Sequence, residues 1–378
     1  MAILLKEVTS KKELKQFVQF GIDLFEGNEY YCPPLIFDEI NTFDKKKNPA
    51  LEFCEYILYL AYKENKIVGR IAGIINHRAN AKWGYKNVRF SWIDFIDDKE
   101  VSFALLKAVS DWGKSKGMTA LNGPVGFTDW DHQGQLIKGF DYNSPMASLY
   151  SYPYYVDHFD AFGLQKEIDW IEYRIFIPKA IPERMERVAK IVIDRLKLKI
   201  EKFKSESEMR KRFPNFEYMD VLDAAYAPLY NYQPMTERQK QYYAKMYFPL
   251  LNFDFVTIIT NEKNEIVGVG VGMPDISPAL RKCKGRLFPL GWYYILKMLK
   301  SKQIEAFDLL LIAVRADYQN KGVNALFFYD QVKYFIKYGI KHCETTSVLE
   351  SNTKMLANFE DFEKIQNKRR RAYIKPLE

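Results

Sequence analysis

The stretch from Leu309 to Leu326 reads LLLIAVRADYQNKGVNAL and decides the fold class. Its first six residues form a continuous apolar run, which is typical of a buried strand. A polar turn follows, and from Val323 onward apolar residues recur at helical spacing. The sequence therefore predicts a strand, a tight turn and a helix in direct succession.

The predicted turn has the features of an anion site. The first backbone N–H groups of a helix have no partner within the helix, and the helix dipole adds partial positive charge there. Gly322 has no Cβ that would hold a phosphate away from the main chain, and Lys321 adds a cation beside it. We therefore expect a phosphate ligand at this turn. The alternative is an ordinary strand-to-helix turn that uses glycine for its geometry.

Working outward from this stretch, the predicted elements occur in the same order in both halves of the chain. Each half contains a strand, helical material, a β-hairpin, a further strand, a helix and another strand, which favours a duplicated domain. The predicted boundary lies at Pro178 to Pro182, giving domains 1–178 and 179–378. The expected strands are 3–8, 56–62, 67–75, 89–96, 119–125, 168–177, 199–203, 255–259, 266–271, 307–314, 343–349 and 370–375, and the expected helices are 11–24, 100–116, 183–196, 323–338 and 353–359.

This arrangement resembles the GNAT (acyl-CoA N-acyltransferase) superfamily. The family pattern after its fourth strand is Gln or Arg, two residues, Gly, one residue, and Gly or Ala; Gln319 and Gly322 match it. Asn352 matches the asparagine that begins the family's next helix and contacts the cofactor. The chain departs from the pattern at Asn324, which stands at the final Gly or Ala. It also has Phe359 where many members carry a tyrosine that protonates the leaving thiolate.

The resemblance implies an α/β (α+β) protein of two tandem GNAT-like domains, each a mixed, mostly antiparallel sheet flanked by helices. Domain 179–378 would bind acetyl-CoA or another acyl-CoA. Domain 1–178 would be a degenerate copy that has lost cofactor binding, because Asp97 to Glu100 place carboxylates where a pyrophosphate needs free amides. This domain would contribute to acceptor binding instead. The implied cofactor-binding residues are Ile312, Ala313, Val314, Gln319, Asn320, Lys321, Gly322, Val323, Asn324, Ala325 and Asn352.

The expected activity is transfer of an acyl group from a coenzyme A thioester to a small-molecule or peptide amine. The candidate acceptor wall is the Gly-rich loop 122–135, in which His132 would act as base with Asp129 and Asp131 as partners. A connection rich in Asx turns, with a structural histidine, is the alternative. Two other functions stay open. One is a non-catalytic protein that binds or senses an acyl or nucleotide ligand; the other is a peptidyl transferase that uses aminoacyl-tRNA.

Composition narrows the function only partly. The net charge of +8 favours an anionic partner, although nucleic acid is not expected beyond the aminoacyl-tRNA alternative. The four cysteines are widely spaced and none of them forms a CxxC motif, so neither a metal site nor a disulfide framework is indicated. A cytoplasmic location is expected. The basic and aromatic segment 281–300 predicts either a packed helix or contact with an anionic membrane. The basic run 368–371 is typical of a solvated edge, and nothing in the sequence indicates the oligomeric state.

Overall fold

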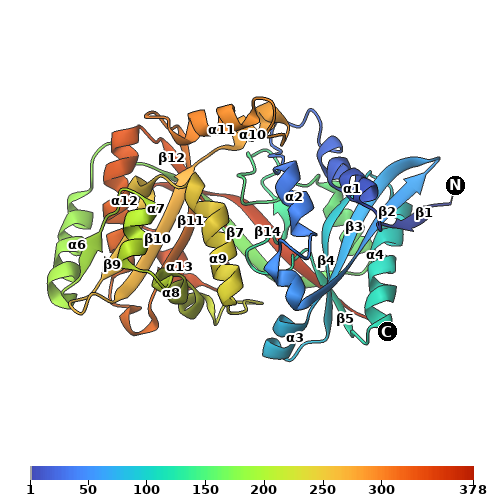
Figure 1. Ribbon diagram of the computed structural model, residues 1–378, viewed down its shortest axis with the longest axis horizontal. Coiled ribbons are helices and arrows are strands. Elements are labelled where there is room, and N and C mark those ends of the chain that lie inside the picture. Colours follow the sequence, from blue (N-terminus) through green and yellow to red (C-terminus); the bar gives the residue numbers. More distant parts are fainter. Residues whose placement is uncertain (1) are drawn as a thin grey trace. The chain divides into compact units, whose positions relative to one another are not determined.

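The computed structural model describes residues 2–378, which form two compact units (Figure 1). Unit 1 contains the chain up to Ile171 together with Ser277–Tyr294 and Asn367–Glu378. Unit 2 contains Glu172–Ile276 and Ile295–Gln366. Each unit therefore draws on more than one stretch of sequence, and strands β7 (Gln165–Phe176) and β14 (Lys364–Pro376) contribute residues to both.

Unit 1 is built on a sheet in which strands follow one another almost in chain order. Its strands are β1 (Leu4–Glu7), β2 (Cys54–Lys63), β3 (Lys66–Asn76), β4 (Asn87–Phe95) and β5 (Ala120–Gly123), followed by the C-terminal part of β14, on which β6 (Gln135–Lys138) also pairs. Along this order the pairings are antiparallel except that of β4 with β5. The β2–β3 hairpin turns at Glu64 and Asn65, whose positive φ angles suit the twist of a two-residue turn.

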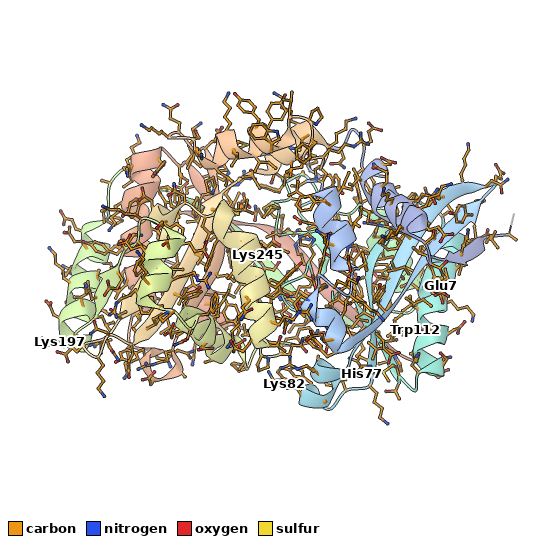
Figure 2. The ribbon with its side chains drawn as sticks, viewed as in Figure 1. Glu7, His77, Lys82, Trp112, Lys197 and Lys245 are labelled. Atoms are coloured by element: carbon orange, nitrogen blue, oxygen red, sulfur yellow. The ribbon has the colours of Figure 1, made fainter. Side chains whose placement is uncertain are left out.

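Helices cover both faces of the unit 1 sheet because side chains alternate across each strand. Ile71 and Ile75 of β3 join one core with α4 (Lys99–Ser115) and α5 (Tyr154–Ala161). Trp112 of α4, labelled in Figure 2, packs against this core. Ala72 and Ile74 join a second core with α1 (Lys11–Asp23). The remaining helical segments of this unit are α2 (Ile36–Thr42), η1 (Pro49–Glu52), α3 (His77–Trp83) and α10 (Ser277–Cys283).

Unit 2 repeats the pattern. Its sheet order is β8 (Lys199–Glu201), β9 (Val256–Thr260), β10 (Ile266–Pro274), β11 (Ala306–Val314), β12 (His342–Thr345) and then the C-terminal part of β7. Along this order the pairings are antiparallel except that of β11 with β12. Its other elements are α6 (Glu183–Leu196), α7 (Glu206–Arg212), α8 (Glu217–Tyr226), α9 (Glu237–Tyr247), η2 (Phe248–Leu250), η3 (Phe253–Phe255), η4 (Ala316–Tyr318), α12 (Asn324–Tyr338), β13 (Val348–Leu349) and α13 (Thr353–Ala357). Helix α11 (Gly291–Leu299) begins in unit 1 and ends in unit 2.

Two glycines bring α12 close to the unit 2 sheet. A Cβ at Gly268 or Gly270 of β10 would lie 2.8 Å and 2.6 Å from ring atoms of Phe327 on α12. A larger residue at either position would therefore push α12 outward, because packed cores do not yield by this much without cost. The close packing fixes the start of α12 relative to the end of β11, where the candidate site lies.

The predicted fold class is confirmed: the structure is a mixed α/β protein with mostly antiparallel sheets flanked by helices. The prediction of a solvated edge at 368–371 is wrong. Arg370 is fully buried, and its guanidinium donates a hydrogen bond to the Leu149 carbonyl. Its neighbours Arg369 and Arg371 both bind the buried carboxylate of Asp169, at 2.7 Å and 2.8 Å. Burial by itself would raise the pKa of Asp169, but the hydrogen bonds and positive charges of Arg371 and Arg369 outweigh it and lower the pKa. The two arginines therefore keep the buried carboxylate ionised.

Candidate active site

Strand β11 loses its pairing with β12 halfway along its length. The parallel register runs from Ala306↔His342 to Leu309↔Thr345 and stops there, whereas β11 continues to Val314. The antiparallel register with β10 also shifts at this point, leaving Leu310 as the extra residue of a β-bulge. The last five residues of β11, Leu310 to Val314, therefore form a strand edge that β12 does not cover. At its start the Leu310 carbonyl accepts a hydrogen bond from the Thr346 hydroxyl at 3.1 Å.

The main-chain groups of Ile312 and Val314 point toward this uncovered edge. The Arg315 amide donates to the Val267 carbonyl of unit 2, so alternation along the strand turns its even-numbered neighbours away from β10. Two side chains approach from the other side. The Tyr226 hydroxyl donates to the Ile312 carbonyl at 3.3 Å, and the Gln319 side-chain amide donates to the Val314 carbonyl at 3.0 Å.

The turn after β11 leaves the start of α12 uncapped. Asn320 and Gly322 have φ angles of 58° and 86°, and the N-cap residue Val323 makes no side-chain capping bond. Across residues 2–378, no hydrogen bond is found from the amides of residues 320–324, and the Asn324 side chain does not cap them. Amides at a helix N-terminus that have no partner within the chain are the groups that bind phosphate.

Cations lie beside these amides. Lys321 is exposed in the turn itself, and its carbonyl accepts a hydrogen bond from the Arg195 guanidinium at 2.7 Å. Arg195 comes from the last turn of α6, so it brings a second positive charge to the loop. Gly322 also lies against α6, because a Cβ at this position would be 3.0 Å from Val192. Nothing in the sequence around the turn indicated the role of α6.

The corresponding helix of unit 1 differs at the same position. The Asp98 carboxylate caps α4 by accepting from the Glu100 amide at 2.9 Å, and Lys63 binds the same carboxylate at 2.7 Å. The bond with Lys63, opposed in part by burial, lowers the pKa of Asp98. An anionic ligand would therefore meet a carboxylate here instead of free amides.

The strand before α4 is also closed by side chains of unit 1. The Phe95 amide donates to the Tyr155 hydroxyl at 3.2 Å, and the Tyr154 hydroxyl donates to the Phe95 carbonyl at 2.6 Å. Farther back, the Val125 amide donates to the Phe90 carbonyl at 3.1 Å, which brings loop 123–127 onto β4. In unit 1 both the amide and the carbonyl of Phe95 are thus bonded to side chains, whereas on the uncovered edge of β11 the side-chain bonds from Tyr226 and Gln319 both go to carbonyls.

Two other residues singled out by the family pattern have clear structural positions. The Asn352 side chain caps α13 by accepting from the Met355 amide at 3.2 Å, which leaves its amide nitrogen for another partner. Phe359 is buried and packs edge-on against Phe328 in a core with Ile175 and Val348. Its side chain has no ionisable proton and lies in an apolar core, so Phe359 takes no part in proton transfer.

In the candidate acceptor loop, His132 and Asp131 each form a hydrogen bond with a different main-chain group. The ring nitrogen Nε2 of His132 lies 3.0 Å from the Met146 carbonyl, which requires that this nitrogen carry the proton. Burial lowers the pKa of His132. The Asp131 carboxylate accepts from the Thr128 amide at 2.9 Å and closes its own turn. Asp129 follows Thr128 directly in the same turn. Their predicted catalytic roles remain predictions.

The buried carboxyl of Asp131 predicts a pH-dependent change in stability. Burial raises the pKa of Asp131 to about 6. The pKa of this carboxyl is higher in the folded protein than in the unfolded chain, where it is about 4. The unfolded chain therefore gives up the proton more readily, and the free energy of unfolding falls as the pH rises from about 4 to about 6. We expect Asp131→Asn to raise the free energy of unfolding at about pH 8 by on the order of 2 kcal/mol, with the difference disappearing near pH 4.

Thermal melting across this pH range measures the effect, and Asp157→Asn, at an exposed aspartate of the same unit, is the matched control. Asparagine retains a carbonyl oxygen for the Thr128 amide, so the capping contact survives the substitution. An Asp131→Asn protein whose melting temperature differs from the parent by the same amount at every pH would contradict the raised pKa.

Several comparisons place this structure among known proteins. No family model matches the chain. Protein YghO of Escherichia coli (strain K12) is 28% identical over 384 residues, covering 99% of this chain and 95% of that protein. Bacterial ceramide synthase of Caulobacter vibrioides (strain NA1000 / CB15N) is 25% identical over 382 residues, covering 98% and 96%.

Solved structures give the fold. A tandem GNAT protein from the clavulanic acid biosynthesis pathway superposes with a TM-score of 0.58 at 10% identity, covering 100% of this chain and 99% of its own. A GCN5-related N-acetyltransferase from Sphaerobacter thermophilus gives 0.50 at 9% identity, covering 99% and 96%. The chain therefore has the GNAT acyltransferase fold. More particularly, it has the tandem GNAT arrangement, which confirms the resemblance drawn from its sequence.

Neither a metal cluster nor a membrane-spanning helix is found in the part of the chain that the structure describes. Among these residues, no group of three or more His, Cys, Asp or Glu side chains could hold a metal ion. Within residues 2–378, every helix is too short or too polar to cross a bilayer.

Proposed function

We propose that this protein is an acyltransferase that moves an acyl group from a coenzyme A thioester to an amine. The observation that carries the proposal is the uncapped start of α12 directly after the uncovered edge of β11, within a GNAT fold. The uncapped helix start offers amides to a pyrophosphate, and the uncovered strand edge offers main-chain groups to an extended arm that contains amides. Their succession along one strand, turn and helix matches the order of these groups in coenzyme A.

The residues present fit this donor. The amides of residues 320–324 would hold the pyrophosphate, with Lys321 and Arg195 as cations beside it. The main-chain amides of Ile312 and Val314 would donate to carbonyls of the pantetheine arm, while the carbonyls of these two residues accept from Tyr226 and Gln319. Asn324 is compatible with this arrangement, since its side chain does not occupy the amides. A bound thioester supplies an acyl carbon that an amine can attack.

Tyr226 is the proposed proton donor to the leaving sulfur. Its hydroxyl lies on the uncovered edge of β11, hydrogen-bonded to Ile312, and it comes from helix α8 of the same unit. Burial raises the pKa of Tyr226 to about 12. The phenol is therefore protonated at neutral pH, as an ordinary tyrosine also is, and it carries the proton that a leaving thiolate needs. A protonated donor at this edge supplies the group that Phe359 lacks.

The acceptor proposed here is a long-chain lipid amine. The support is the 25% identity, over nearly the whole of both chains, with a protein named as a ceramide synthase. Forming a ceramide joins an acyl group to the amine of a sphingoid base, so the reaction class is amide formation. His132, Asp131 and Asp129 in loop 122–135 remain the proposed acceptor-side residues of unit 1.

The experiment is an acyl-transfer assay with the full chain. Acetyl-CoA, palmitoyl-CoA and an aminoacyl-tRNA are each offered as donors with sphinganine, a polyamine and a peptide amine. Free thiol release from the two thioesters and product mass from all three donors are measured. We expect thiol release that depends on an amine and a product heavier by the acyl group, with sphinganine the preferred acceptor. Binding of acyl-CoA without transfer to any amine would favour the non-catalytic sensor. Transfer only from aminoacyl-tRNA would favour the peptidyl transferase.

A further inference from the structure

One short segment contains half of the large apolar side chains that the structure exposes. In the described part of the chain, ten such residues are exposed, and five of them lie within nine consecutive positions. Phe288 is the most exposed of all, at 76%. The five residues, which we call the apolar patch, are Phe288, Leu290, Trp292, Tyr293 and Leu296.

Helix α11 presents apolar side chains on both of its faces. Ile295 and Leu299 are buried, and their spacing of four residues defines the inward face. Trp292 and Leu296 have the same spacing but are 45% and 40% exposed. A surface helix ordinarily places polar residues there. The exposed ring is held in place, because the indole N–H of Trp292 donates to the Pro289 carbonyl at 3.0 Å.

The charged side chains that this segment itself carries all have one sign. Between Ile276 and Ile304 the sequence has seven Lys or Arg residues and no Asp or Glu. The exposed ones are Lys282, Lys284, Arg286, Lys297, Lys300 and Lys302. Lys284 is paired with Glu26 of the same unit at 2.6 Å. Figure 2 shows side chains, rings among them, standing out from α10 and α11.

We propose that this segment docks on an anionic lipid bilayer, with the apolar patch in the interface and the flanking cations on the headgroups. Trp and Tyr are the side chains that favour the membrane–water interface, and basic residues bind acidic lipids. A second copy of the chain fits poorly. A two-fold contact through this segment would set one cationic surface against another. The proposal goes beyond the acyltransferase function and is tested by binding alone, so either can fail without the other.

The test is flotation of the full chain with two kinds of vesicle. One kind is phosphatidylcholine alone, and in the other about a third of the lipid is phosphatidylglycerol. We expect binding to the anionic vesicles that weakens as salt is raised. The double variant Phe288→Ser/Trp292→Ser should lower this binding at least about tenfold, because two large apolar side chains no longer leave water.

Two further variants sharpen the result. Lys297→Glu/Lys300→Glu leaves the apolar patch intact and should also lower binding by about tenfold or more, since each cation near an acidic surface contributes about fivefold. Ile191→Ser, at a residue of α6 that is 55% exposed, is the matched control and should bind as the parent does. Melting temperatures of all variants establish that they are folded.

Four outcomes would overturn the proposal. The first is that the parent does not float with anionic vesicles. The second is that it floats equally well with either kind of vesicle. The third is that both double variants bind as the parent does. The fourth is that light scattering shows a dimer in the parent that dissociates in Phe288→Ser/Trp292→Ser, which would assign the apolar patch to a second copy of the chain.

Discussion

Replacing Gly322 with aspartate should weaken coenzyme A binding at least about a hundredfold, which corresponds to about 2.7 kcal/mol. The site depends on main-chain amides at the start of α12 that the chain leaves without partners. A carboxylate in the turn would occupy or repel the same place, as Asp98 does at the start of α4 in unit 1. Isothermal titration of the full chain with coenzyme A measures the loss.

Backbone strain must be separated from charge in this experiment. Gly322 has a φ of 86°, so any side chain there is strained, and its Cβ would also meet Val192. Gly322→Asn has nearly the same size and strain without the charge, and it should lose less affinity than Gly322→Asp. Gly339→Asp places the same carboxylate at another positive-φ glycine, at the far end of α12, and should bind coenzyme A normally.

Equal affinity in the parent and in Gly322→Asp would contradict the proposed phosphate site. So would an equal loss in Gly322→Asp and Gly339→Asp, because that result would attribute the effect to general destabilisation of α12 and not to the amides at its start.

Tyr226→Phe should lower the turnover number of acyl transfer by about a hundredfold while leaving the KM for acyl-CoA nearly unchanged. Loss of a general acid costs roughly 10²- to 10⁴-fold in rate, and it does so in the transition state more than in the bound complex. The substitution removes the hydroxyl that donates to the Ile312 carbonyl on the uncovered edge of β11. Steady-state kinetics with saturating amine separates the two parameters.

Tyr218→Phe is the matched control for this prediction. Tyr218 lies on the same helix, is buried, and its hydroxyl has no hydrogen-bond partner among the described residues. Removing that hydroxyl should change neither kinetic parameter. A Tyr226→Phe enzyme with parental turnover would exclude Tyr226 as the proton donor, and an increase in KM alone would assign it to binding.

Much of the fold could be predicted because its signals are local. Helix α6 was predicted with the same bounds as it has in the structure, since Pro182 precedes a strongly amphipathic stretch that ends before Lys197. The hairpin of β2 and β3 was likewise clear from two apolar runs around a polar turn. Strand β6 and helix α3 were missed because they have four and seven residues, too few for a periodic pattern to emerge.

The candidate site could be predicted only where it is contiguous in sequence. The strand, turn and helix from β11 to α12 lie within one short stretch, and their pattern identified it. Tyr226 and Arg195 reach the same place from 86 and 126 residues away, without a motif of their own. The basic run 368–371 was misinterpreted for a similar reason: Asp169, which compensates it, lies 200 residues earlier.

Hydrogen–deuterium exchange of the full chain, with and without saturating coenzyme A, tests the central claim most directly. We expect slower exchange for the amides of residues 320–324 when coenzyme A is bound, and unchanged exchange at the start of α4, where Asp98 already caps the helix. Protection at the start of α4 with none at residues 320–324 would contradict the proposed site. So would the absence of protection at both helices in a protein that coenzyme A stabilises against heat.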